Sequence, residues 1–403
     1  MKSCGVVVEY NPFHNGHYYH LQQARIQTEA DCIVAVMSGP FLQRGEPAII
    51  DKWHRTKAAL RGGADLVVEL PFLYAVQNSD FFSKGAIRIL ADLGVQAVCF
   101  GSESGRIDAF LQTKEQMELH EDTYQETLRK SMAEGLSFPE ASRLGYEAID
   151  FPDGAVDMSQ PNNILGLSYL KEIAAYAPHI DPVTILRKDS HYHEEDITGT
   201  IASATSIRRE LLKKQCLTEA AVKSLRKDTV EQLLSYRSMA GVWHEWERYF
   251  QLLQYKVGTM EASVLRSIHG VDEGLEYRLK RLMKDAVSFQ DFMDKVKTKR
   301  YTWTRLQRTL VHILVGTDKE TARRELQEEQ PPYARVLGMN EHGRSFLKEA
   351  KKTTPVPVIT QPQQLTHPLL ELEERATAAY YAPLAPKQRT ALMKREYQAP
   401  VIL

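Results

Sequence analysis

Two histidines near the start of the chain, His14 and His17, have the type and the spacing that could do chemistry on a phosphate group. They lie three residues apart, so a helix that begins at Asn15 would place both on one face. The first turn of such a helix offers free backbone N–H groups and the positive end of the helix dipole to an anion. Both imidazole rings could then donate hydrogen bonds to a phosphate on which negative charge develops.

The residues around this pair place it at a turn between a strand and a helix. Val6, Val7 and Val8 form a β-branched run that suits a buried strand, and Pro12 cannot continue it. Gly16 has no side chain, which lets a base or a phosphate come close to the backbone. Two histidines at this spacing are also common as surface or structural residues. No further ligands follow at zinc-finger spacing, so no metal site is expected.

The rest of the N-terminal half alternates strands with helices. Buried apolar runs predict strands at residues 32–37, 65–70, 97–101 and 182–187. This rhythm is typical of an α/β fold with a Rossmann-like parallel sheet, in which ligands bind beyond the carboxyl ends of the strands. The loops that begin at Tyr10, Ser38, Pro71 and Gly101 should therefore converge on one site.

The length of 403 residues favours two domains. Residues 1–215 are expected to form the Rossmann-like domain, with a charge-rich helical insertion at 106–150 that covers or flanks the site. Residues 216–403 show no regular alternation of strands and helices, which predicts a mainly α-helical second domain. Within it, 356–360 could be a lone strand.

A basic stretch in the second half is typical of a surface that binds a nucleic acid. Between Arg278 and Arg308, ten Lys or Arg residues stand against three Asp. They are interleaved with Tyr301 and Trp303, which could stack on bases. Alternatively, this is a solvated helix whose aromatic residues belong to the core. The candidates for contact with nucleic-acid phosphates, expected to lack acidic neighbours, are Lys297, Lys299, Arg300, Arg305 and Arg308.

The composition, with 26% charged and 43% hydrophobic residues, describes an ordinary soluble globular protein. The net charge of −1 restricts any nucleic-acid surface to a local patch. No apolar run is long enough to span a bilayer, and no secretory signal is expected. The four cysteines have no CxxC spacing, and three lie in or beside predicted strands. Buried free thiols and a cytoplasmic location are therefore expected.

Several motifs carry a resemblance to a known family. His14-Asn-Gly-His17 resembles the His-x-Gly-His signature of the nucleotidyltransferase superfamily, and "IASATSIR" at 201–208 resembles the second signature, which grips the triphosphate. The runs "VVVEYNPFHNGH", "SGPFLQRGEPAIIDKWHR", "QPNNILGLSYLKEI" and "KRYTWTRLQRTLVHIL" are similar to the bacterial tRNA(Met) cytidine acetate ligases. Pro40 departs from the "SGNF"-like loop of that family. The resemblance extends to about residue 316 and is weaker beyond.

The resemblance implies an ATP-dependent ligase that forms acetyl-adenylate from acetate and acetylates N4 of the wobble cytidine of elongator tRNA(Met). Residues 1–215 would then be the adenylation domain and 216–403 the RNA-binding domain, and no membrane or protein partner is implied. His14 and His17 would be catalytic, and Mg²⁺ would bridge the phosphates. The implied ATP-binding residues are Val7, Val8, Glu9, Tyr10, Asn11, Pro12, Phe13, His14, Asn15, Gly16, His17, Tyr18, Tyr19, His20, Gly101, Asn162, Arg187, Ser203, Thr205 and Arg208.

A smaller group of polar residues could orient acetate or cytosine. These residues, in the loops after the second strand, are Ser38, Gln43, Arg44, Asp51 and Lys52. Asp51 and Lys52 could equally be a helix cap and its neighbour in the first turn.

Two other functions remain compatible with the motifs. One is a small-molecule adenylyltransferase of the pantetheine or nicotinate mononucleotide type, against which the long basic helical half argues. The other is a non-catalytic, nucleotide-dependent RNA-binding factor, against which the two intact histidines argue.

Overall fold

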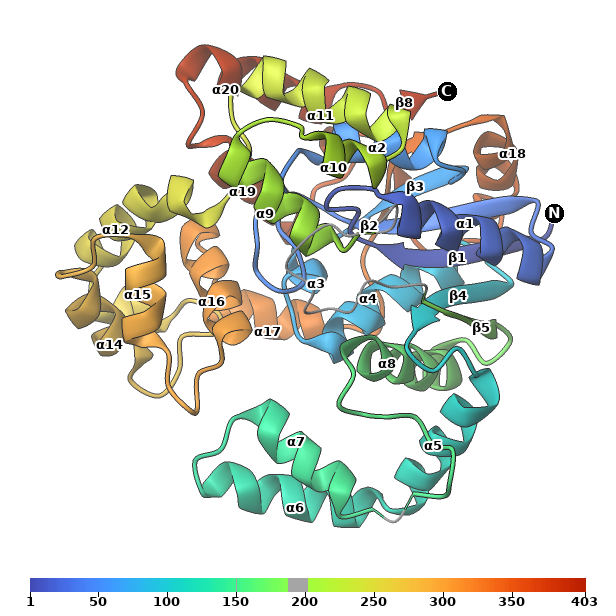
Figure 1. Cartoon of the computed structure of the whole chain (residues 1–403), viewed down its shortest axis with the longest axis horizontal. Coiled ribbons are helices and arrows are strands. Elements are labelled where there is room, and N and C mark those ends of the chain that lie inside the picture. Colours follow the sequence, from blue (N-terminus) through green and yellow to red (C-terminus); the bar gives the residue numbers. More distant parts are fainter. Residues whose placement is uncertain (150, 188–201) are drawn as a thin grey trace.

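The computed structural model describes residues 1–149, 151–187 and 202–403, and these residues form an eight-stranded sheet flanked by helices (Figure 1). The strand order is β5-β4-β1-β2-β3-β6-β7, and β8 pairs with β6. All pairs among β1 to β5 are parallel, whereas β6 runs antiparallel to β3. The strands are β1 (Ser3–Val8), β2 (Cys32–Ser38), β3 (Leu66–Leu70), β4 (Ala97–Ser102), β5 (Asp181–Leu186), β6 (Ala334–Met339), β7 (Val358–Ile359) and β8 (Val401–Ile402).

Helices cover both faces of the parallel part of the sheet. Because successive side chains of a strand point to opposite faces, Val6 packs in one core with Leu21 of α1 and Ala59 of α2, whereas Val34 packs in another with Leu90 of α4. This arrangement confirms the predicted α/β fold with a Rossmann-like parallel sheet. The helices of this part are α1 (Asn15–Thr28), α2 (Lys52–Arg61), α3 (Phe72–Ala75), α4 (Ser79–Asp92), α8 (Pro161–Tyr176) and α9 (Ala204–Lys214).

The region after residue 216 is mainly helical, as predicted, but its last part returns to the sheet. Strand β6 pairs with β3 and carries both β7 and β8. The two-residue strand β7 lies within the segment expected to be a lone strand, and that expectation is wrong because β7 is hydrogen-bonded to β6. The division into domains at residue 215 stays a prediction, since the sheet takes strands from both sides of it.

Two groups among the remaining helices project from the sheet. In Figure 1 the hairpin of α6 and α7 lies below the sheet, and α12, α14, α15 and α16 lie to its left. The helices are α5 (Ile107–Leu119), α6 (Glu121–Ala133), α7 (Phe138–Glu147), α10 (Glu219–Lys223), α11 (Lys227–Ala240), η1 (Trp246–Tyr249), α12 (Phe250–Thr259), α13 (Ala262–Arg266), α14 (Leu275–Met283), α15 (Phe289–Val296), α16 (Trp303–Val315), α17 (Lys319–Gln327), α18 (Glu341–Ala350), η2 (Pro362–Gln364), α19 (Pro368–Tyr381), α20 (Pro386–Met393) and η3 (Lys394–Tyr397).

Two further features bear on the sequence predictions. Cys4, Cys32 and Cys99 are buried free thiols, as expected, whereas Cys216 is exposed. Within the part of the chain that the structure describes, no helix has the length and apolar composition needed to cross a bilayer.

Candidate active site

A cavity of about 860 Å³ opens at the carboxyl ends of the parallel strands. Glu9 lines it just beyond the end of β1 and Gly101 at the end of β4, while Gln43 and Ser79 reach it from the segments that follow β2 and β3. The predicted convergence of these loops is therefore confirmed. The volume lies at the upper end of the range for sites that enclose one small ligand, roughly 300–1,000 Å³.

The two histidines of the first turn hold each other in place. His14 is the N-cap of α1, and its Nδ1 accepts the backbone N–H of Gly16 at 3.0 Å. The Nδ1 of His17 accepts the backbone N–H of His14 at 3.3 Å, which closes a reciprocal capping box. The two rings stack with 3.7 Å between their centroids. Because each Nδ1 accepts a hydrogen bond, the neutral rings carry their proton on Nε2.

Burial keeps these rings uncharged at neutral pH. It lowers the pKa of His14 to about 3, with smaller effects from the positive charges of Arg187 and Arg208. Burial and the neighbouring His14 likewise hold the pKa of His17 well below its ordinary value. The pKa of His20, whose Nε2 lies 3.2 Å from the carbonyl oxygen of Cys99, falls to about 4 for the same main reason. The site thus offers neutral imidazole N–H donors.

Three of the predicted ATP-site residues outside the first helix meet on one wall of the cavity. The side chain of Asn162, in the first turn of α8, donates to Glu103 Oε1 at 2.6 Å and accepts from Arg187 Nη1 at 2.9 Å. Gly101 lies against the same arginine, because a Cβ at this position would stand 3.1 Å from Arg187 Cγ. The structure therefore brings Gly101, Asn162 and Arg187 together although they are up to 86 residues apart.

Some residues between Val7 and His20 line the cavity, and the others pack behind this lining. Val7, Val8, Glu9, His14, Gly16, His17, Tyr19 and His20 line the cavity. Supporting residues pack behind it: the rings of Tyr10 and Phe13, at most 1% exposed, make an edge contact at 4.7 Å. Asn11 Oδ1 accepts the N–H of Ile49 at 2.7 Å. Among the described residues, the predicted members that do not line the cavity are Tyr10, Asn11, Pro12, Phe13, Asn15 and Tyr18.

The second signature lies beside the cavity. Ser203 is the N-cap of α9, and its Oγ accepts the N–H of Ser206 at 3.0 Å. Arg208 donates to the carbonyl oxygen of Asn11 and to Glu46 Oε2, each at 2.9 Å. Ser203, Thr205 and Arg208 are not among the described residues that line the cavity. Arg208 thus anchors α9 to the loop that leads into the histidine pair.

The residues predicted to orient acetate or cytosine lie in two different parts of the structure. Gln43 and Arg44 line the cavity. The backbone N–H of Gln43 donates to Glu9 Oε1 at 2.7 Å, and its side chain donates to the carbonyl oxygen of Gln77 at 2.9 Å. Next to them, Gly45 has φ +78° and lies against the backbone of Arg308 on α16. The loop after β2 is therefore fixed against the helical half.

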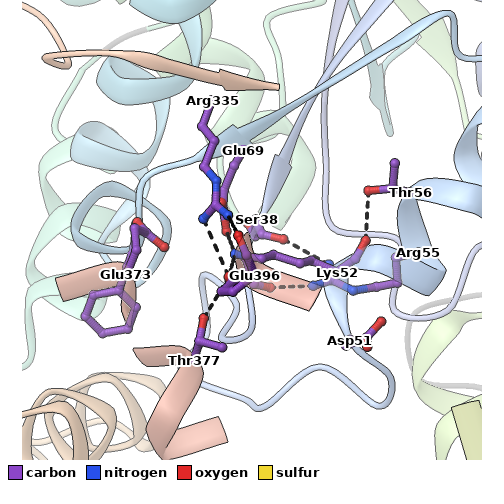
Figure 2. A network of polar contacts seen from close by, with 12 residues as sticks. Ser38, Asp51, Lys52, Arg55, Thr56, Glu69, Arg335, Glu373, Thr377 and Glu396 are labelled. Atoms are coloured by element: carbon purple, nitrogen blue, oxygen red, sulfur yellow. Dashed lines mark hydrogen bonds and ion pairs between the residues drawn. The ribbon is translucent and has the colours of Figure 1, made fainter. Parts of the chain in front are cut away.

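Asp51 and Lys52 lie instead in a buried network away from the cavity lining (Figure 2). Asp51 caps α2 by accepting the N–H of His54 at 2.8 Å, and it accepts the hydroxyl of Tyr381 at 3.0 Å. Lys52 Nζ lies 2.6 Å from Glu69 Oε1 and also contacts the carboxylate of Glu396. Their arrangement matches the alternative of a helix cap and its neighbour. Ser38 is also fully buried.

The basic candidates likewise fall into different surroundings. Arg308 lines the cavity, and burial lowers its pKa to about 10. Arg300 forms an ion pair with Glu273, so the expectation that it lacks an acidic neighbour is wrong; the partner lies 27 residues earlier in the chain. Arg305 lies over the ring of Tyr301 at 4.9 Å. Lys297 and Lys299 are exposed.

Tyr301 does not match its predicted role of stacking on a base. Its side chain is only 7% exposed, and its hydroxyl donates to the carbonyl oxygen of Asp272 at 3.1 Å. The alternative in which it belongs to the core holds for Tyr301. Trp303, at the start of α16, remains partly exposed.

Parts of the cavity wall carry no signal in the sequence. The insertion contributes Phe138, Ser142 and Tyr146 from α7 to the cavity lining. Thr304 comes from the first turn of α16. Which face of an inserted hairpin meets the site depends on how it folds back, and this cannot be inferred from local patterns.

Comparisons with known proteins give a consistent result over the whole chain. A model of the family "HIGH Nucleotidyl Transferase" matches residues 1–396. A "tRNA(Met) cytidine acetate ligase" of Oceanobacillus iheyensis is 50% identical over 403 residues, covering 100% of both chains. The Bacillus subtilis protein of the same name is 43% identical over 405 residues, covering 100% of this chain and 97% of its own. The similarity is thus not confined to the first 316 residues.

Solved structures agree with these matches. The apo crystal structure of Thermotoga maritima TmcAL superimposes with a TM-score of 0.90 at 32% identity, covering 100% of both chains. A structure of the same protein bound with alpha-thio ATP gives a TM-score of 0.89 with the same identity and coverage.

Proposed function

Because this chain belongs to the HIGH nucleotidyl transferase family, and within it to the tRNA(Met) cytidine acetate ligases, we propose a two-step reaction for it. In the first step ATP and acetate form acetyl-adenylate and pyrophosphate. In the second step the acetyl group passes to N4 of the wobble cytidine of elongator tRNA(Met). The ATP analogue bound by the Thermotoga maritima protein supports ATP as the nucleotide.

The observation that carries the proposal is the stacked, neutral histidine pair at the base of the cavity. Adenylation places negative charge on the α-phosphate as the acetate oxygen attacks and pyrophosphate leaves. His14 and His17 supply N–H donors fixed before the reaction by their mutual capping, so no reorganisation is needed when the charge develops. Because both rings are neutral, they remain donors without a change of charge near pH 7.

The other site residues receive supporting roles in this proposal. Residues 7–20 with Gly101, Asn162 and Arg187 bind ATP, and Arg187 faces the phosphates from the wall formed with Asn162. We further propose that Ser203, Thr205 and Arg208, which lie beside the cavity lining, hold the pyrophosphate as it departs. Gln43 and Arg44 lie where acetate or cytosine would enter, whereas Ser38, Asp51 and Lys52 support the sheet beneath.

Magnesium fits this site only through the nucleotide. In the parts of the chain that the structure describes, no group of three or more His, Cys, Asp or Glu side chains is arranged to hold a metal ion. Mg²⁺ in nucleotide sites is commonly bound through substrate phosphates and water with few protein ligands. We propose that it takes its ligands from the ATP phosphates, where it would neutralise their charge.

We propose that the tRNA is bound along the helical half, residues 216–403, while residues 1–215 carry out adenylation. Lys297 and Lys299 are exposed cations that can bind phosphates, and Arg300, Arg305 and Arg308 continue this basic surface up to the cavity. Phosphate contacts would position the anticodon loop without reading its sequence. The wobble base must leave the loop to reach the cavity, as single-stranded RNA permits.

The decisive experiment is acetate-dependent exchange of labelled pyrophosphate into ATP, with and without tRNA. Exchange with acetate, followed by acetylation of tRNA(Met), is the expected result. Exchange with nicotinate mononucleotide or phosphopantetheine instead of acetate would indicate a small-molecule adenylyltransferase. Tight tRNA binding with no exchange under any condition would indicate a non-catalytic factor.

A further inference from the structure

One glutamate in the cavity is held in place at both its side chain and its backbone. Glu9 lines the cavity just beyond β1, next to the turn that carries the histidines. Its Oε1 accepts the backbone N–H of Gln43 at 2.7 Å. Its backbone carbonyl oxygen accepts from Arg55 Nη1 at 2.7 Å, and Arg55 is 0% exposed. The same guanidinium binds the carbonyl oxygens of Ser38 and Gly39, so it joins the ends of β1 and β2.

Glu9 differs in this respect from the other carboxylate that lines the described part of the cavity. Glu140, on α7, is paired with Arg143 on the surface, and its side chain is 46% exposed. Burial raises the pKa of Glu9, while the hydrogen bond from Gln43 and the charges of Arg44 and Arg208 oppose this rise. A carboxylate so placed is a stronger base than an exposed one.

The proposed acetyl transfer needs a base at this place. The exocyclic amine of cytosine is a weak nucleophile because its lone pair is delocalised into the ring, and it must lose a proton as it forms the new bond. The histidines are unsuited to accept that proton, since the pKa of His14 is about 3 and that of His20 about 4. Carboxylates, in contrast, are the usual protein acceptors for the N4 amine of cytosine.

Resting on the proposed function, we infer that Glu9 binds the N4 amine of the wobble cytidine and accepts its proton during acetyl transfer. The N4 lone pair attacks the carbonyl carbon of acetyl-adenylate, and a C–N bond forms. The C–O bond to the phosphate breaks, and its electron pair leaves on the AMP oxygen. One N4 proton passes to the Glu9 carboxylate and from there to solvent. Glu9 thereby acts in the second step, whereas His14 and His17 act in the first.

The test compares the two steps in Glu9→Gln. Glutamine keeps an oxygen for the Gln43 N–H but cannot act as a base at neutral pH. Single-turnover acetylation of tRNA should fall by roughly 10²–10⁴-fold, the usual contribution of a general base. Acetate-dependent pyrophosphate exchange should fall by less than about tenfold, because glutamine keeps the shape and the oxygen that Glu9 presents to bound ATP. Glu140→Gln is the matched control, as it removes a carboxylate from the same cavity and should change neither rate appreciably.

A second variant and a pH profile separate chemistry from positioning. Glu9→Asp retains a carboxylate one methylene further away, so it should restore part of the transfer rate that glutamine loses. The wild-type transfer rate should decline at acid pH as Glu9 is protonated, and this decline should be absent in Glu9→Gln. The ionisable groups that face Glu9, and that are retained in both proteins, are Arg44, Glu46, Arg55, Tyr169 and Arg208.

Each alternative outcome overturns the inference in a recognisable way. If Glu9→Gln loses exchange and transfer in the same proportion, Glu9 serves ATP or acetate binding and not proton transfer. If transfer proceeds at the wild-type rate, Glu9 has no role in it. If wild-type protein shows no acetate-dependent exchange, the proposed function fails and the inference fails with it, whatever the variant does.

Discussion

Arg335 on β6 and Glu69 on β3 form an ion pair inside the sheet, with 3.1 Å between Nη1 and Oε2 and with both side chains at most 1% exposed. Glu396 completes the pair with a second carboxylate, 3.5 Å from the same nitrogen, and Lys52 contacts both acids (Figure 2). The two cations and two anions are therefore mutually neutralised although they come from opposite ends of the chain.

Removal of Arg335 should destabilise the protein strongly. Arg335→Met leaves two buried carboxylates with one cation, and breaking a buried pair typically costs about 3–5 kcal/mol. The free energy of unfolding, measured with denaturant, should fall by that amount. Arg300→Met is the control, because its pair with Glu273 is about half exposed and should contribute no more than about 1 kcal/mol. Equal losses in both variants would contradict the assigned role of burial.

His17→Ala should abolish most turnover without unfolding the protein. Removal of one preorganised donor to a developing negative charge typically costs roughly 10²–10³-fold in rate. The pyrophosphate exchange rate should fall by this factor, while the protein stays folded and still binds tRNA. Near-normal exchange in this variant would indicate that the histidine pair is structural and not catalytic.

The depressed pKa of His14 predicts acid sensitivity. The folded value is about 3 and the ordinary value 6.5, so the unfolded chain takes up this proton first as pH falls. Stability should therefore decrease below about pH 6.5, by up to about 1.4 kcal/mol per pH unit from this one group. His14→Asn keeps a capping side chain but does not titrate. Its unfolding free energy should show a correspondingly flatter dependence between about pH 4 and 6; parallel curves would exclude His14 as the cause.

The exposed lysines and the cavity arginine should behave differently in tRNA binding. Lys297→Gln with Lys299→Gln should weaken affinity and reduce the salt slope by about one for each phosphate that is no longer bound, with pyrophosphate exchange retained. Arg308 lines the cavity, so Arg308→Gln should impair exchange as well as tRNA binding. A salt series for affinity, run beside exchange assays, distinguishes the two; an unchanged affinity of the lysine variant would remove these residues from the tRNA surface.

Gly45 provides a test of the contact between the loop after β2 and α16. A Cβ at Gly45 would stand 2.4 Å from the backbone nitrogen of Arg308, and φ is +78°. Gly45→Ala should therefore introduce both backbone strain and a steric clash with backbone atoms that cannot move aside. Its free energy of unfolding should fall by about 1–3 kcal/mol more than that of a variant with backbone strain alone. Gly241→Ala is that matched change, with φ +75° and no atom within 4 Å. Equal melting temperatures in the two variants would show that the loop and α16 separate freely.

Much of the sheet and of the cavity wall around the histidine pair could be predicted because the signals for both are local. A valine run before Pro12 indicates a strand, and the histidine spacing indicates a helix start. The structure has both. Arg335 shows why β6 escaped prediction: a charged residue in a short run looks exposed until Glu69, 266 residues away, is known to neutralise it. Lys52 was open to two interpretations for the same reason, since its second partner is Glu396.

The return of the chain to its own sheet has a consequence for synthesis. In the part of the chain that the structure describes, β6 is the strand that pairs with the outer edge of β3, and β6 in turn pairs with β7 and β8. While a ribosome is still making the helical half, β3 exposes unpaired backbone groups, the kind of strand edge that promotes association between chains. Glu69 meanwhile lacks its arginine. If the first five strands assemble before the rest of the chain is made, β3 stays at a bare edge until residues 334–339 have emerged to pair with it.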